Sequence, residues 1–212
     1  MESYAGTRPP ATVEHRRSDR LGGTDGNELL TIAMAGVLTL LLAAEGITLL
    51  RMNSLLSVHM FIGLVLIPPL LLKIGSTGYR FARYYTHNRA YVDKGPPALP
   101  LRLMAPVLVL TTVGIFVTGV LLLALGHKSD QLVLLHKASF IVWAACFGIH
   151  FLAYLPRVLT SLLTDWRGAR AHPIPGAGLR AMLVAASIGA GAALAISLLG
   201  AITGWHGGGG SG

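Results

Sequence analysis

Five apolar runs, each long enough to cross a bilayer, constrain this chain more than any other feature of its sequence. They are separated by polar segments and fall at 28–50, 54–75, 102–126, 131–155 and 179–204. A helix needs about 20 mostly apolar residues to span the hydrocarbon core. With 53% hydrophobic and only 12% charged residues, the chain has too little polar sequence to cover a soluble domain of 212 residues. We therefore predict an all-α integral membrane bundle of five transmembrane helices.

The two ends of the chain differ from the bundle at 28–206 in composition. Residues 1–27 are polar and rich in Arg, Pro and Gly, which predicts a flexible cytoplasmic tail without a core. The end 207–212 is almost all glycine and is typical of an expression linker. The single cysteine, Cys146, excludes an intramolecular disulfide and a cysteine metal cluster.

The distribution of cations predicts the orientation of the bundle. Segments 51–53 and 127–130 are too short for anything but tight helical hairpins. The N-terminus, the 76–101 and 156–178 loops and the adjoining helix ends therefore share one side, which carries fourteen of the 17 Lys and Arg residues. Cytoplasmic loops carry the excess of Lys and Arg, so this side is predicted to be cytoplasmic. We interpret the net charge of +8 as the signal that orients the helices in the membrane, and we expect no nucleic-acid partner. The protein is predicted to be a multi-pass protein of the inner (plasma) membrane, surrounded by membrane lipid.

The fourth apolar run carries two histidines, His136 and His150, with Trp143 midway between them. Fourteen residues bring a helix back to within about 40° of its starting face and advance it about 21 Å. One face of one helix would thus present an imidazole near each side of the bilayer. Ionisable residues inside a membrane are costly and usually functional, and a neutral imidazole is a good ligand for haem iron.

A third histidine, His59, completes a candidate pair with His136. Each lies about five residues into a helix that enters the membrane from the non-cytoplasmic side, so their predicted depths match. Two histidines at one depth on different helices can clamp a haem between them. Gly63 lies one turn beyond His59, where a missing side chain leaves room for a flat macrocycle. A lone membrane histidine more often hydrogen-bonds a neighbouring helix, but the matched depth favours the haem.

The cytoplasmic level of the bundle has a less complete set of ligands. His150 is the natural ligand there, but the position fourteen residues after His59 is Lys73. Three interpretations stay open: a haem with an unusual second ligand, a five-coordinate haem, and no haem. One or two haems are therefore expected in total, with His59, His136 and His150 as the iron ligands. Trp143 is interpreted as core packing or, between two haems, as an aromatic ring that shortens the path of electrons through the protein.

Several polar residues near the outer level are candidates for supporting roles. Arg51, Lys128 and Lys137 could pair with haem propionates, although Arg51 and Lys128 could equally be ordinary turn residues. Glu45, well inside the first apolar run, could hydrogen-bond a ligand histidine, pair with Lys137 or accept a proton from a quinol. Pro68 and Pro69 interrupt the hydrogen bonding of the second helix and free the carbonyls of Leu64 and Val65. The freed carbonyls could shape a pocket, but a tolerated kink is the favoured interpretation.

Residues 54–155 resemble the membrane b-type cytochromes of the cytochrome b561 and ferric-reductase-like transmembrane kinds. The resemblance is carried by Val58-His59 with Gly63, by the His136 and His150 pair on one helix and by Trp143 between them. It implies a four-helix haem-binding core that holds one or two b haems and passes electrons to or from quinone or a partner redox subunit. The missing fourth membrane histidine departs from that pattern.

From the sequence we expect a haem b electron-transfer protein, the cytochrome b subunit of a larger oxidoreductase rather than a self-contained enzyme. No nucleotide-binding loop or nucleophile–base set is recognisable, and no catalytic residue is assigned. The alternative is a non-haem transporter or metal-ion carrier with Glu45, His59 and His136 as its site. A structural assembly factor, whose histidines only bridge helices, is the third hypothesis.

Overall fold

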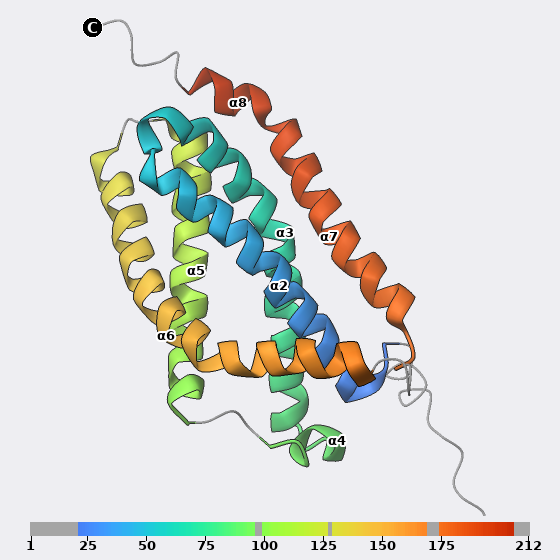
Figure 1. Ribbon diagram of the computed structural model, residues 1–212. Coiled ribbons are helices and arrows are strands. Elements are labelled where there is room, and N and C mark those ends of the chain that lie inside the picture. Colours follow the sequence, from blue (N-terminus) through green and yellow to red (C-terminus); the bar gives the residue numbers. More distant parts are fainter. Residues whose placement is uncertain (1–20, 96–98, 127–128, 169–173, 206–212) are drawn as a thin grey trace, which may run out of the picture.

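The computed structural model describes residues 21–95, 99–126, 129–168 and 174–205, and these contain helices and turns but no strand. The helices are α2 (Gly23–Leu50), α3 (Met52–Tyr85), α4 (Arg89–Val92), α5 (Leu99–Leu125), α6 (Asp130–Gly168), α7 (Ala177–Ser197) and α8 (Leu199–Gly204). Figure 1 shows the long helices running between the two ends of an elongated bundle. The predicted all-α class is confirmed.

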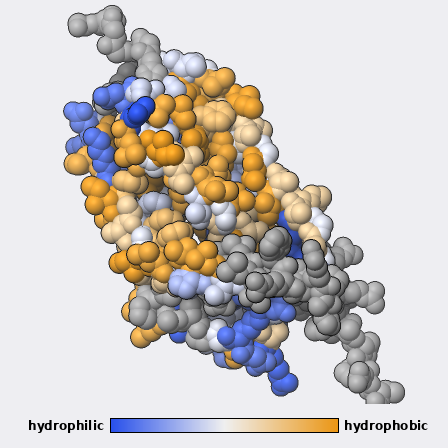
Figure 2. Space-filling view, viewed as in Figure 1, coloured by the Kyte–Doolittle hydropathy of each residue, from blue (hydrophilic) through white to orange (hydrophobic). Residues whose placement is uncertain are grey.

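Five of these helices, α2, α3, α5, α6 and α7, are long and apolar enough to cross a membrane. Hydrophobic side chains cover the middle of the visible face, and hydrophilic ones gather toward its two ends (Figure 2). Many large apolar side chains point outward, such as Leu40 (74% exposed) and Leu110 (71%). Outward-facing apolar residues in the middle of a bundle are what a lipid environment requires. The prediction of five helices that are long and apolar enough to span a membrane is therefore confirmed for the described residues.

The bundle is built from two packed groups of helices. In one, α2 and α7 both pack against α3; in the other, α5 packs against α6. The groups meet mainly through α3 and α5, and much less extensively than the helices within each group. The buried core lies in the first group, where Leu64 and Val65 of α3 meet Ala195 and Ile202. The space between the two groups is where the predicted ligand histidines face each other.

Two helices extend beyond the apolar runs from which they were predicted, because the polar residues that follow are also helical. α3 runs to Tyr85 and α6 to Gly168, so much of the predicted 76–101 and 156–178 loops is helical. Loss of hydrophobicity marks the edge of a membrane but does not stop a helix, which ends only where a breaker or tertiary contacts intervene. At 34 residues, α3 is about 51 Å long. Figure 1 shows the last part of α6, beyond Pro156, turning aside and running across the lower end of the bundle.

The Pro68-Pro69 pair lies inside α3 and does not end it. The helix is continuous through both prolines, and its one non-helical residue is Leu55. Because Pro69 has no N–H, the carbonyl of Val65 lacks its usual helical partner. Gly191 of α7 packs onto this carbonyl so closely that a Cβ there would lie 2.3 Å from the oxygen. The α3–α7 crossing is therefore closest at the carbonyl that lacks its helical partner, and only a glycine fits there.

Polar contacts join α2 to α3 near the end of the bundle where α2 begins. Asn27 donates to the backbone oxygen of Ser76 at 3.2 Å, and the hydroxyls of Thr31 and Ser76 lie 3.2 Å apart. The Lys73 ammonium donates to the backbone oxygen of Thr31 at 2.7 Å. Buried polar groups are costly unless they are hydrogen-bonded, and these contacts satisfy one another across the helix pair.

Candidate functional site

The imidazole rings of His59 and His136 face each other between the two helix groups. Their centres lie 6.5 Å apart, and their planes are inclined at 87°. His59 belongs to α3 and His136 to α6, two helices whose backbones barely approach each other. The structure therefore brings together the two histidines whose depths were predicted to match.

His59 is held by two residues of α2. Its Nδ1 lies 2.8 Å from Glu45 Oε1 and 3.1 Å from Thr48 Oγ1. The Thr48 hydroxyl donates its own hydrogen to the backbone oxygen of Glu45 at 2.6 Å, so toward His59 it can only accept. These acceptors favour the tautomer with hydrogen on Nδ1 and leave a free electron pair on Nε2. The sequence left three roles open for Glu45, and of these the structure contains the contact with His59.

His136 is held in a matching way by α5. Its Nδ1 lies 2.9 Å from Thr118 Oγ1, and the Thr118 hydroxyl donates to the backbone oxygen of Gly114 at 2.6 Å. Because its hydrogen is already donated, the Thr118 hydroxyl can only accept from His136. His136 therefore donates from Nδ1 and keeps a free electron pair on Nε2. Metal-ligating histidines almost always use their other ring nitrogen in this way, which fixes the ring and raises the basicity of the ligand.

The spacing of the two rings fits a shared metal. An imidazole nitrogen binds a transition metal at about 2.0–2.1 Å, and the ring centre lies about 1.1 Å behind that nitrogen. Two imidazoles on opposite sides of one metal would therefore have centres roughly 6.3 Å apart, close to the observed 6.5 Å. Inclined ring planes are compatible with this arrangement because both planes can contain the axis that joins the two nitrogens.

Glycines give the rings room. A Cβ on Gly119 of α5 would lie 3.3 Å from His136 Cε1, and one on Gly114 would lie 3.1 Å from Ser139 Oγ, so both glycines let α5 approach α6 closely. A Cβ on Gly63 would make ordinary contact with Glu45 Oε1 at 3.7 Å. Gly63 therefore lies beside the Glu45–His59 pair, and its predicted role in making room for a macrocycle stays a prediction.

An aromatic stack continues along α6 from His136. Trp143 stacks on Phe147 with centres 4.7 Å apart and planes at 7°, and on Phe140 at 6.2 Å and 27°. Phe147 in turn stacks on Phe151 at 5.7 Å. The stack explains the position of Trp143 between the two histidine levels as packing. Its additional role between two haems stays a prediction.

His150 lies at the other end of that stack and does not join the first pair. Its Nδ1 is buried without a hydrogen-bond partner among the described residues, and its ring lies 4.7 Å from that of Tyr154. Lys73 is near enough to act on it electrostatically, but the Lys73 ammonium is bonded to Thr31. The structure thus supplies no second histidine at this level within the described residues.

The predicted propionate partners lie near the end of the bundle that is closer to His59 and His136. Arg51 forms the α2–α3 turn, and Lys137 follows His136 directly. Both are exposed, and neither side chain has a polar partner in the part of the chain that the structure describes. Lys128 lies outside the described residues.

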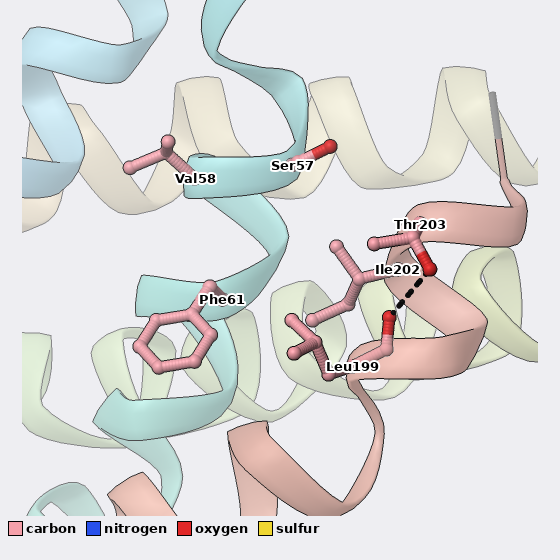
Figure 3. A pocket seen from close by; sticks show the side chains of 6 residues that line it. All are labelled: Ser57, Val58, Phe61, Leu199, Ile202 and Thr203. Carbon is pink, nitrogen blue, oxygen red and sulfur yellow. Dashed lines mark hydrogen bonds between the residues drawn. The ribbon is translucent and has the colours of Figure 1, made fainter.

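A small apolar pocket near His59 is a separate feature. It measures about 240 Å³ and is lined by residues of α3 and α8, namely Ser57, Val58, Phe61, Leu199, Ile202 and Thr203 (Figure 3). The Thr203 hydroxyl donates a hydrogen bond to the backbone oxygen of Leu199 at 3.0 Å. Neither of the opposed histidines lines this pocket.

The fold and the site define a class: a five-helix membrane protein with two opposed histidines held between its helix groups. Among the described residues, the structure contains no group of three or more His, Cys, Asp and Glu side chains placed to hold a metal ion. Comparison with protein-family models, with curated proteins and with solved structures finds no match to this chain. The resemblance to membrane b-type cytochromes thus depends on the residues named above.

Proposed function

We propose that this chain is a haem b membrane electron-transfer protein in which His59 and His136 would hold the iron of one haem. One observation carries the proposal: two imidazoles from different helix groups, each with Nδ1 committed to a neighbour and Nε2 free, lie at the spacing that a shared iron requires. A neutral imidazole is a common axial ligand of haem iron.

The haem, when bound, would supply one-electron exchange. The chain would set the reduction potential of the iron and shield the haem from its surroundings. Glu45 and Thr48 accept the Nδ1 hydrogen of His59, and this makes the ligand more basic and favours the oxidised, more positive iron. Thr118 does the same for His136. Arg51 and Lys137, exposed near that end, would pair with the carboxylates of the group.

The protein would exchange electrons with quinone or with a partner redox subunit, as the membrane subunit of a larger oxidoreductase. Positive residues gather where α3 ends and α5 begins, including Arg80, Arg83, Arg89, Lys94 and Arg102. By the distribution of cations this end faces the cytoplasm of a cell with an inner (plasma) membrane. The His59–His136 haem would then lie in the half of the membrane away from the cytoplasm. A second haem at His150 would need a further ligand.

The decisive experiment measures haem per mole of protein by the pyridine haemochrome assay. The unmodified protein should bind at least one b haem, and His59→Ala and His136→Ala should each remove the haem at this site. His87→Asn is the matched control, because His87 lies outside the spans, contacts the backbone oxygen of Tyr85 at 3.0 Å and has a φ of 58° that Asn tolerates. Full haem content in either alanine variant would refute the assignment, and a colourless protein with bound divalent metal would favour the carrier hypothesis.

A further inference from the structure

A long apolar groove lies between α2 and α7, near the end of the bundle where both helices begin. Its volume is about 550 Å³, and it is open rather than enclosed. Its lining is apolar except for one residue, Arg180; the walls are Leu29, Leu30, Ile32 and Ala33 of α2 and Ala177, Ala181, Val184, Ala185 and Ile188 of α7. The alanines, having almost no side chain, leave the space that the two helices enclose.

Arg180 brings a buried positive charge to this groove. The residue is only 8% exposed. Its guanidinium donates to the backbone oxygens of Leu21 at 2.8 Å, Pro175 at 2.7 Å and Ile174 at 3.3 Å. A guanidinium has five N–H groups, so two are left. No carboxylate lies within ion-pair distance of Arg180 among the described residues.

From this combination we infer that the groove binds an anionic phospholipid, with one acyl chain along α2 and α7 and the phosphate at Arg180. Backbone carbonyls satisfy hydrogen bonds but cannot neutralise a full positive charge, and a buried charge is costly unless it is paired. A guanidinium matches the geometry of phosphate oxygens and is weakly hydrated. The surrounding bilayer supplies chains that fit an open apolar groove of this size.

The inference commits to a phospholipid rather than to a fatty acid or a zwitterionic lipid. A zwitterionic lipid has the same chains but carries a cation that would face Arg180, whereas an anionic phospholipid brings a net negative charge. The site lies on the helix group that does not contain His136, and its occupation requires no haem. Failure of this inference is therefore distinguishable from failure of the proposed electron-transfer function.

The test is native mass spectrometry of the full chain in detergent, titrated separately with dioleoylphosphatidylglycerol, dioleoylphosphatidylcholine and oleate. The anionic phospholipid should bind at least about fivefold more tightly than the zwitterionic one, since one basic residue near a membrane is worth about 1 kcal/mol. Arg180→Gln should remove this preference. Ala185→Leu and Ala33→Leu, which keep Arg180 and fill the groove from opposite walls, should weaken binding of both phospholipids.

Ala145→Leu on exposed α6 is the matched control and should leave lipid binding unchanged. Because Arg180 also holds three carbonyls, the groove-filling variants decide the result if Arg180→Gln fails to fold. Equal affinity for the two phospholipids, binding of oleate alone, or unchanged binding in both groove-filling variants would each overturn the inference.

Discussion

Thr48 and Thr118 hold the two opposed histidines in the same way. Each threonine lies on the helix that precedes the helix of its histidine and forms a hairpin with it. Both hydroxyls donate to a carbonyl of their own helix, of Glu45 and Gly114, and both lie at hydrogen-bond distance from an Nδ1 atom. Two unrelated parts of the chain thus set the same tautomer and the same free nitrogen. This shared arrangement is the feature from which the chemistry of the site follows.

Replacing these threonines with valine should weaken haem binding unequally. Thr118→Val removes the hydroxyl that accepts from His136 and leaves this ring only a backbone hydrogen bond with Ile115, whereas after Thr48→Val the Nδ1 of His59 keeps the carboxyl of Glu45. Loss of such a supporting partner typically costs 10–100-fold in metal affinity, so we expect an effect of about that size for Thr118→Val and a smaller one for Thr48→Val. Haem titration of the apoprotein measures both.

Thr111→Val and Thr39→Val are the controls, because those hydroxyls bond only within their own helices. Equal haem affinity in Thr118→Val and Thr111→Val would show that Thr118 does not support the ligand.

Gly119→Val should displace His136 and lower the haem content. A Cβ at Gly119 would already lie 3.3 Å from His136 Cε1, and two further methyl groups leave no room for the ring in its present place. Gly36→Val is the control, since nothing lies within 4 Å of a Cβ there. The absorbance ratio of haem to protein in the purified variants measures the effect. Equal ratios in the two variants would mean that the ring does not need this position.

Gly191→Ala should destabilise the bundle even though it lies far from the histidines in sequence. Its Cβ would lie 2.3 Å from the backbone oxygen of Val65, so α7 must move away from α3. Overpacking of this kind typically costs about 1–3 kcal/mol, which a thermal unfolding scan in detergent would register as a lower midpoint. Gly189→Ala, two residues away with nothing within 4 Å, should be nearly neutral. Similar midpoints for the two variants would contradict the close α3–α7 crossing.

Lys94 should stabilise the fold less at alkaline pH. Burial lowers the pKa of Lys94, but hydrogen bonds to Asp25 at 2.6 Å and Glu28 at 2.8 Å outweigh burial and raise the pKa above its ordinary value. A raised pKa in the folded state gives a stabilisation that is complete below the unfolded pKa of about 10.4 and is lost as pH rises through the folded pKa.

The difference in unfolding midpoint between the unmodified protein and Lys94→Gln should therefore shrink as pH rises above about 10. It should amount to no more than about 1 kcal/mol at neutral pH, since Lys94 and both carboxylates are at least partly exposed. A difference that stayed constant or grew in alkaline solution would contradict the ion pair.

The number of spans and the facing of His59 and His136 followed from the sequence, because hydropathy and helix rise alone set depth in a bilayer. The residues that hold the two histidines could not be predicted from the sequence. Thr48 and Thr118 are single hydroxyls in apolar runs, and which face of α2 or α5 turns toward a histidine depends on how the helices rotate against one another.

The close approach of Gly191 to the Val65 carbonyl also could not be predicted, because it depends on where α7 crosses α3. The ends of α3 and α6 were missed for a related reason, since hydropathy reports where a helix leaves lipid and not where it stops.

Electron paramagnetic resonance of the oxidised, purified protein tests the central claim most directly. Two imidazoles on one ferric haem give a low-spin signal, and planes near the observed 87° should give the strongly anisotropic, large-g form of that signal. We predict this signal in the unmodified protein and its loss in both His59→Ala and His136→Ala. A high-spin signal alone, or a low-spin signal that persists without either histidine, would contradict the account.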